Sequence, residues 1–184
     1  MDILPRSFYD RNAKEVAPDL LGMNLVRTLD GEARVGRIVE TEAYLGPPDL
    51  AAHSTKGKTR RTSVMYGPPG YAYVYLIYGM YHCLNAVTGP GEHSSAVLIR
   101  ALEPVSGIEG ATNGPGRLCR SLAIDLTLYG HDLSAGELVI ARPDEPDEAF
   151  TIATRPRIGV DYAKEWALEP LRFLIEGNSW VSRR

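Results

Sequence analysis

The sequence predicts an α+β fold, with one domain over residues 1–184 built around a curved mixed or antiparallel β-sheet, peripheral helices and a protruding β-hairpin. A length of 184 residues suits a single hydrophobic core, and no linker-like segment marks a domain boundary. Runs of aromatic and β-branched residues are more frequent than stretches with helical periodicity. Turn signals such as Asp30-Gly31 separate neighbouring runs, which is typical of antiparallel hairpins.

The N-terminal part is expected to form a helix and then a hairpin. Asp10 is a suitable N-cap for a helix over residues 11–21, which would end at Gly22 and which Pro18 must kink or shorten. The hairpin strands cover residues 24–29 and 33–44.

The middle of the chain predicts a long loop followed by a second hairpin. Residues 46–70 are rich in Pro, Gly, Lys and Arg, and loops of this length are usually functional or disordered. The next strands cover residues 71–78 and 81–88, with Gly79-Met80 between them.

The C-terminal half is expected to alternate strands with short helices. One strand covers residues 95–103 and ends at Pro104. A helix over residues 117–124 follows the Gly- and Pro-rich stretch 113–116, and Asp161 is a good N-cap for another helix reaching Leu168. The remaining predicted strands cover residues 137–141, 150–154 and 171–175.

Composition and charge leave the nature of the partner open. The formal net charge is −3, and hydrophobic residues make up 44% of the chain. A basic run is separated in sequence from an acidic run, and each could equally be a solvated loop. The basic run contains Lys56, Lys58, Arg60 and Arg61, and the acidic run contains Asp144, Glu145, Asp147 and Glu148. Charge therefore neither supports nor excludes a nucleic-acid partner.

The sequence also predicts the cellular compartment of the protein. No apolar run approaches the roughly 20 residues that span a membrane, and the N-terminus lacks the pattern of a signal peptide. Cys83 and Cys119 are the only cysteines, too few for a disulfide framework. We expect a protein of the cytoplasm, or of the nucleus in a eukaryote, with no membrane association.

The strand over residues 33–44 carries a candidate catalytic group. Glu40, Glu42 and Tyr44 alternate, so their side chains point to one face. The face is either exposed to solvent or the floor of a cleft that holds a catalytic carboxylate beside an aromatic wall. Spacing by two places the carboxylates roughly 6.5–7 Å apart, so a two-carboxylate glycoside hydrolase remains an alternative.

The second hairpin contributes further candidates. Tyr71, Tyr73 and Tyr75 share a face, which is typical of a core as well as of a binding site. Tyr78 lies at the hairpin tip, where an exposed aromatic ring suits an interaction surface or a wedge between DNA bases. The histidines lack the spacing of a zinc site, and no phosphate-binding loop is present, so we expect no metal and no cofactor.

Taken together, these stretches resemble the alkyladenine (3-methyladenine) DNA glycosylases, the monofunctional type that lacks a helix-hairpin-helix. The similarity runs in consistent order from Leu4-Pro5 to the C-terminus. The matching stretches are residues 37–47, Ala51-Ala52-His53-Ser54, residues 73–81, Cys83-Leu84-Asn85, residues 97–104, Gly114-Pro115-Gly116-Arg117-Leu118-Cys119, Pro170-Leu171-Arg172-Phe173 and Trp180-Val181-Ser182. His82 departs from the family, which often has an apolar or aromatic residue there.

The resemblance implies a role for each matching residue. Glu42 would activate water, with Arg100 helping to hold that water and the carboxylate. Tyr44 on one side, with His53 and Tyr75 on the other, would sandwich a flipped base. Glu40 would orient the site without acting as a catalytic acid. Asn85 would disfavour normal guanine by clashing with its exocyclic amine. Tyr78 would be the intercalating wedge, supported by Met80 and Tyr81. The remaining implied DNA contacts are Lys56, Lys58, Arg60, Arg61 and Arg117.

The implied activity is removal of damaged purines from double-stranded DNA by a monomer. Alkylation at N3 or N7 gives the purine a positive charge, which weakens the glycosidic bond and favours stacking on aromatic rings. No lysine lies in an apolar sequence context that would make it a Schiff-base nucleophile, so we expect simple hydrolysis to an abasic site. A single-strand binding module and a carbohydrate hydrolase remain as alternatives.

Overall fold

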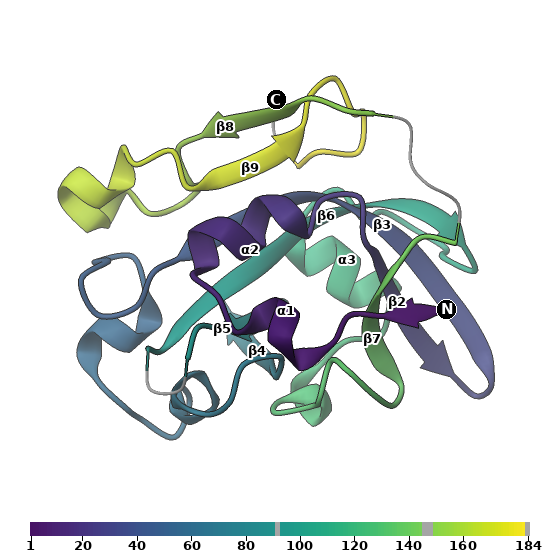
Figure 1. Cartoon of the computed structure of the whole chain (residues 1–184), viewed down its shortest axis with the longest axis horizontal. Coiled ribbons are helices and arrows are strands. Elements are labelled where there is room, and N and C mark those ends of the chain that lie inside the picture. The colour runs from purple at the N-terminus through teal and green to yellow at the C-terminus, as the bar shows by residue number, and fades with distance from the viewer. Residues whose placement is uncertain (91–92, 145–148, 183–184) are drawn as a thin grey trace.

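The computed structural model describes residues 1–90, 93–144 and 149–182, which form a strongly curved sheet with short helices around it (Figure 1). Every strand pair in these ranges is antiparallel, so the predicted α+β class is confirmed and the sheet is antiparallel rather than mixed.

The elements follow one another closely along the chain. They are β1 (Asp2–Ile3), α1 (Arg6–Tyr9), α2 (Ala13–Asp19), β2 (Asn24–Leu29), β3 (Glu32–Tyr44), the 3₁₀ helices η1 (His53–Lys56) and η2 (Ser63–Tyr66), β4 (Ala72–Ile77), β5 (Tyr81–Thr88), β6 (Ser95–Ser106), α3 (Pro115–Ser121), the 3₁₀ helix η3 (Leu126–Leu128), β7 (Leu138–Arg142), β8 (Ile152–Arg155), η4 (Asp161–Ala167) and β9 (Arg172–Ile175).

The long strand β3 organises the sheet. The strand order is β1-β7-β2-β3-β6-β5-β4, and β3 pairs with β2 along its first half and with β9 along its second half. Strand β8 pairs with β9, and in Figure 1 these two strands form the upper layer of the molecule. Residues 40–42 therefore lie between β6 and β9, which encloses them on both edges.

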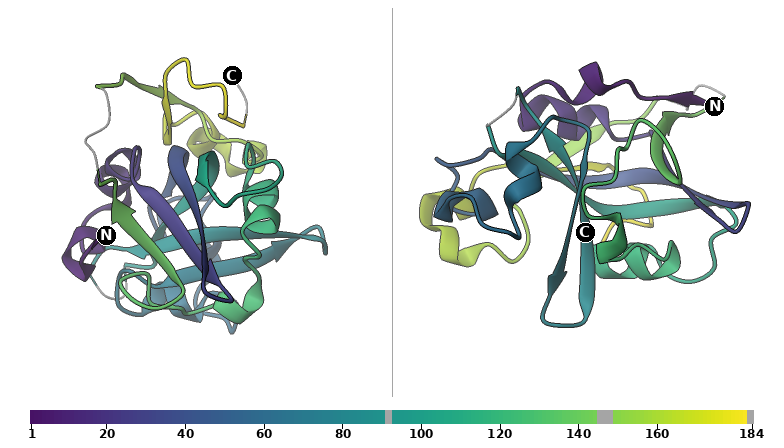
Figure 2. Two further views of the ribbon diagram at one scale, coloured as in Figure 1. Left: turned by 90° about the vertical axis from the view of Figure 1, so that its right-hand side faces the viewer. Right: turned by 90° about the horizontal axis from the view of Figure 1, so that it is seen from below.

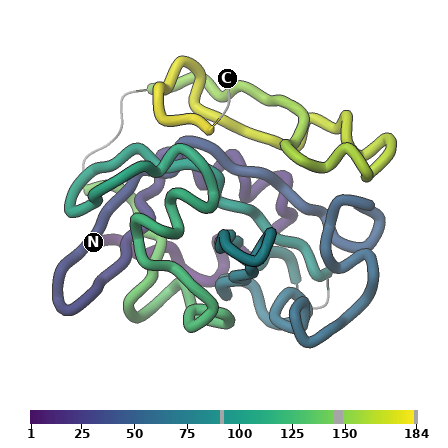
Figure 3. Tube along the Cα trace, turned by 180° about the vertical axis from the view of Figure 1, so that it is seen from behind, coloured from purple at the N-terminus to yellow at the C-terminus, as the bar shows by residue number. Residues whose placement is uncertain are grey.

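Helices pack on both sides of the strands. Helices α1 and α2 lie on the side that faces the viewer in Figure 1, whereas α3 lies on the side that faces the viewer in Figure 3. The apolar side chains of α2 and α3, such as Val16 and Leu118, are buried with those of β3 and β6, such as Ile38 and Ile99, in one cluster. This core makes β3 and β6 a rigid support for the side chains that they carry.

The hairpin formed by β4 and β5 extends beyond the rest of the molecule (Figure 2). Its turn is centred on Tyr78 and Gly79, with φ of 52° and 67°, and is closed by a hydrogen bond from Met80 N to Ile77 O of 3.2 Å. Two left-handed residues match the twist of the strands. The predicted hairpin is confirmed, but its turn begins one residue earlier than the sequence indicates.

The first helix differs from the prediction. Residues 11–21 do not form one helix; α2 covers Ala13–Asp19, and a separate turn, α1, precedes it. Asn12 rather than Asp10 caps α2, because the Asn12 side chain accepts a hydrogen bond from Lys14 N. Pro18 lies in the last turn of α2, and the helix ends one residue later, in line with the expectation that Pro18 shortens it.

The short helix predicted from Asp161 to Leu168 is present only as 3₁₀ turns. The segment forms η4, a pair of 3₁₀ turns separated by a kink, and its N-cap is Val160 rather than Asp161. At the kink Lys164 has φ 53° and ψ −128°, a conformation that glycine adopts more readily than lysine and that interrupts helical hydrogen bonding.

Two further expectations need correction. Strand β6 continues through Pro104 to Ser106, because Pro104 lies at a register shift opposite Gly36, where the regular ladder is already interrupted. The loop over residues 46–70 contains η1 and η2 and is not structureless. Of the acidic run, Glu145, Asp147 and Glu148 lie outside the described residues.

Candidate active site

The two acids of β3 are buried, so the solvent-exposed alternative for this face is wrong. The side chains of Glu40 and Glu42 have no exposed surface. Strands β6 and β9 flank them, and Ser182 and Ile158 cover them from segments that lie more than 100 residues further along the chain. A buried carboxylate is costly unless its oxygens are paired, and both acids are paired.

Glu42 is held by three groups of different kinds. Its Oε2 accepts a hydrogen bond of 2.8 Å from the Tyr44 hydroxyl and lies 3.3 Å from Nη1 of Arg100. Its Oε1 accepts a hydrogen bond of 2.8 Å from the backbone N–H of Ile158. Burial and the neighbouring Glu42 carboxylate raise the pKa of Tyr44, so this hydroxyl stays protonated and can donate.

Glu40 has both oxygens occupied. Oε1 accepts from Arg100 Nε at 3.3 Å, from Arg172 Nη1 at 3.0 Å and from the Ser182 hydroxyl at 3.0 Å, and Oε2 accepts from Ser182 N at 2.6 Å. Glu40 thus contacts Arg100 directly, and its expected role in orienting the site stays a prediction.

Arg100 joins the two acids because the pairing of β3 with β6 is irregular here. The register shifts at residues 38–41, and the Arg100 guanidinium thereby reaches both Glu40 and Glu42. Burial acts to lower the pKa of Arg100, but the two carboxylates outweigh it and raise the pKa above its ordinary value. Arg100 thus carries a permanent charge beside Glu42.

Replacing Glu40 by Gln should lower the free energy of unfolding by about 2 kcal/mol, because the amide nitrogen would face donors and leave them unsatisfied. Urea unfolding monitored by tryptophan fluorescence measures this change. Glu103→Gln is the matched control: this half-exposed acid pairs with Arg37 at 3.3 Å, and its loss should cost less than about 1 kcal/mol. Equal effects of the two variants would contradict the structural role of Glu40.

A cavity of about 640 Å³ opens beside these charged groups. The predicted pocket residues come together around it from five separate elements: Tyr44, His53, Tyr75, Asn85 and Arg100 all border the cavity. Tyr44 and Arg100 also contact Glu42, so the carboxylate lies directly behind the wall of the cavity. The volume is within the range of small-molecule sites in proteins.

One wall of the cavity is made of packed aromatic rings. The ring centroids of His53 and Tyr75 are 4.7 Å apart in an edge-to-face arrangement, and those of Tyr73 and Tyr75 are 5.3 Å apart. Nδ1 of His53 lies 2.9 Å from the Tyr73 hydroxyl. The amide of Asn85 donates to the backbone oxygen of Tyr73 at 3.0 Å, which fixes its orientation at the cavity.

His53 is uncharged at neutral pH. Its pKa is lowered from the usual 6.5 to about 4, first by burial and then by the positive charges of Arg61 and Lys56. A neutral imidazole can stack on a base without adding charge to the cavity.

The lowered pKa of His53 predicts that the free energy of unfolding depends on pH. Between pH 6.5 and about 4 the unfolded chain binds a proton at His53 that the folded chain does not, so stability is fully present above this window and is lost as pH falls through it. The loss should reach about 3 kcal/mol. Urea unfolding at pH 7 and pH 4.5 should therefore show a larger loss for the wild type than for His53→Gln. Parallel losses in the two proteins would contradict the assignment.

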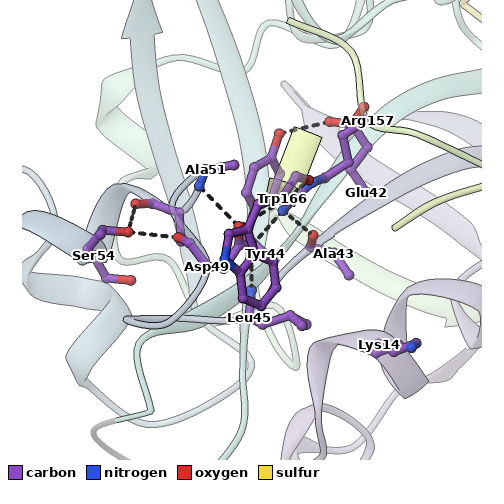
Figure 4. Close-up of polar contacts among 12 residues, drawn as sticks. Lys14, Glu42, Ala43, Tyr44, Leu45, Asp49, Ala51, Ser54, Arg157 and Trp166 are labelled. Atoms are coloured by element: carbon purple, nitrogen blue, oxygen red, sulfur yellow. Dashed lines mark hydrogen bonds and ion pairs between the residues drawn. The ribbon is translucent and has the colours of Figure 1, made fainter. Parts of the chain in front are cut away.

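A buried ion pair supports Tyr44 from behind, and the sequence did not indicate it. Arg157 donates to both oxygens of Asp49, at 2.5 and 2.8 Å, and also to the backbone oxygens of Ala43 and Trp166 (Figure 4). Its guanidinium lies 4.8 Å from the centroid of the Tyr44 ring. The partners are 108 residues apart, so no local pattern could reveal them. The hydrogen bond from the Ile158 backbone N–H to Glu42 could not be predicted either, because a backbone donor does not depend on the type of side chain.

Of the predicted DNA-facing residues, Tyr78, Tyr81 and Arg117 border the cavity. Tyr78 and Met80 at the hairpin tip are 82% and 64% exposed, whereas Tyr81 is 39% exposed and lies over Gly116. Lys56, Lys58, Arg60 and Arg117 are exposed, and Arg117 borders the cavity. Arg61 is exposed as well, and its guanidinium lies 5.0 Å from the centroid of the Tyr75 ring.

The described residues include no group of three or more His, Cys, Asp or Glu side chains arranged to hold a metal ion. In the same part of the chain, no helix is long and apolar enough to cross a lipid bilayer.

Comparison with known proteins identifies the family. The model of the family "Methylpurine-DNA glycosylase (MPG)" matches residues 7–179. A protein of Legionella pneumophila (strain Corby) named "Putative 3-methyladenine DNA glycosylase" is 56% identical over 180 residues, which are 98% of each chain. Proteins of the same name from Anaeromyxobacter dehalogenans (strain 2CP-C) and Myxococcus xanthus (strain DK1622) are 52% and 50% identical, covering 98% and 100% of this chain and 86% and 95% of theirs. The chain therefore belongs to the methylpurine-DNA glycosylase family of DNA N-glycosylases.

Proposed function

We propose that the protein, acting as a monomer, flips alkylated or deaminated purines out of double-stranded DNA and hydrolyses their N-glycosidic bond to leave an abasic site. Candidate substrates are 3-methyladenine, 7-methylguanine, hypoxanthine and ethenoadenine. The observation that carries the proposal is the contact of the buried Glu42–Arg100 pair with the wall of an aromatic cavity that opens beside an exposed tyrosine hairpin.

The hairpin would extract the base. Tyr78 enters the stack in place of the lost nucleotide, and the left-handed backbone at Tyr78 and Gly79 holds its ring at the extreme tip. Met80 and Tyr81 support the wedge against the duplex, and the basic residues around the cavity contact phosphates. The extruded purine stacks between Tyr44 on one side and His53 with Tyr75 on the other.

Glu42 would then act as general base. A water molecule at the cavity wall between Tyr44 and Arg100 loses its proton to Glu42, and its oxygen attacks C1′ of the deoxyribose while the bond to the purine breaks. An alkylated, positively charged purine leaves as a neutral base without further protonation. The carboxylate is held in place by Ile158 and Arg100, so little rearrangement is needed during the reaction.

We infer simple hydrolysis rather than lyase chemistry. A strand-cutting glycosylase needs an amine whose pKa is depressed by an apolar site, so that it can form a Schiff base. The lysines of the chain are all exposed: Lys14, Lys56, Lys58 and Lys164. The paired-carboxylate alternative is disfavoured because the oxygens of Glu40 are saturated by Arg100, Arg172 and Ser182.

Incubation with a duplex that contains a single 7-methylguanine or hypoxanthine tests the proposal. Chromatography should detect the free purine, and the strand should break only after alkali treatment, which cleaves abasic sites. Absence of free purine from every damaged duplex would overturn the proposed reaction. A covalent adduct trapped by borohydride would overturn the hydrolytic mechanism alone.

A further inference from the structure

We propose that Arg61 is a specificity-determining residue, which lowers the preference of the base pocket for positively charged alkylated purines relative to neutral damaged purines such as hypoxanthine. This inference rests on the proposed function, because it concerns which bases the aromatic cavity accepts. It assigns Arg61 a role different from the phosphate contact that the sequence suggests.

The first step is the position of the guanidinium. It lies 5.0 Å from the centroid of the Tyr75 ring, and Tyr75 borders the cavity while Arg61 does not. The guanidinium is therefore stacked behind the wall, on the side turned away from a bound base. Its positive charge also acts on the His53 ring of this wall: burial is the largest cause of the low pKa of His53, and Arg61 is the next.

The second step is the charge balance around the cavity. Arg157, behind Tyr44, is neutralised by Asp49, and Arg100 is neutralised by Glu42 and Glu40. Among the described residues, no carboxylate forms an ion pair with Arg61. Arg61 thus adds, against the Tyr75 ring, a positive charge that no carboxylate of the described residues balances.

The third step is the effect of this charge on a bound base. A purine stacked on the near face of Tyr75 at roughly 3.5 Å would place a cationic lesion about 8–9 Å from the guanidinium. The two cations repel each other, and they also compete for the same electron-rich ring. At an effective dielectric constant between those of the protein surface and water, the repulsion disfavours the cationic base by about 3- to 10-fold. A neutral purine experiences no such repulsion.

The test compares Arg61→Gln with Arg60→Gln on two duplexes of identical sequence, one containing 7-methylguanine and the other hypoxanthine. Arg60 is the matched control, because it is exposed and the hydrogen bonds from Ser63 and Tyr129 are accepted by its backbone oxygen, not by its side chain. Both variants lose one positive charge from the same basic run, so a general weakening of DNA binding affects them alike. The readout is the ratio of kcat/KM for 7-methylguanine to that for hypoxanthine, which cancels effects common to the two substrates.

We expect Arg61→Gln to raise this ratio by about 3- to 10-fold over wild type, whereas Arg60→Gln should change it by less than about twofold. Arg61→Lys keeps the charge and should stay nearer to wild type than Arg61→Gln. An unchanged or lower ratio in Arg61→Gln, or an equal rise in Arg60→Gln, would overturn the role of Arg61. Failure of the wild type to release any damaged base would instead overturn the proposed function, so the two failures are distinguishable.

Discussion

Replacing Glu42 by Gln should slow base release by about 10²- to 10⁴-fold while leaving the affinity for lesion-containing DNA within a few-fold of wild type. The amide has nearly the same shape and can still accept from Ile158 or Tyr44, but it cannot take a proton from water. Single-turnover kinetics with excess enzyme measure the chemical step, and gel-shift titration of the same duplex measures the affinity.

Glu40→Gln is the control for this experiment, because both acids are buried on the same strand and contact Arg100. It removes the same charge and mainly affects stability, so its rate of base release should fall far less than that of Glu42→Gln. Retention of activity by Glu42→Gln, or a larger loss of rate in Glu40→Gln, would reverse the assignment of the general base.

Replacing Arg157 by Ala should lower the free energy of unfolding by about 3–5 kcal/mol. The change leaves Asp49 buried and negatively charged without its bidentate partner, and it removes the guanidinium behind the Tyr44 ring. Urea unfolding measures the loss. Because Tyr44 borders the cavity, lesion affinity measured under folding conditions should fall as well.

Two further variants isolate the ion pair. Arg155→Ala removes an exposed arginine two residues away and should change stability by less than about 0.5 kcal/mol. The double variant Asp49→Ala/Arg157→Ala should be less destabilised than the sum of the single variants, because no lone charge stays buried. A cost below about 1 kcal/mol for Arg157→Ala would show that the pair does not support the site.

The strands were the most predictable part of this fold because their signal is local. Alternating and β-branched residues defined β2 at its observed bounds, and the hairpin of β4 and β5 within one or two residues. Caps and short helices were less predictable. The Asp161 segment has a helix-like beginning, but Lys164 adopts a left-handed conformation that only the surrounding packing imposes.

The candidate site, like the fold, was predictable only in those features that depend on local sequence. Alternation along β3 placed Glu40, Glu42 and Tyr44 on one face, and the ordered resemblance to known glycosylases selected Glu42 as the expected base. Neither could decide whether that face is exposed, because its covering groups, Ile158 and Ser182, come from distant parts of the chain.

The sequence by itself thus determined the fold class, most strands, the family resemblance and five of the residues that border the cavity. Only the tertiary structure decided that both acids are buried, that the Arg157–Asp49 pair lies against the Tyr44 ring and that the Arg61 guanidinium lies against the Tyr75 ring. The physical reason is that burial and electrostatic pairing depend on contacts between residues far apart in the sequence, whereas periodicity records only which neighbours share a face.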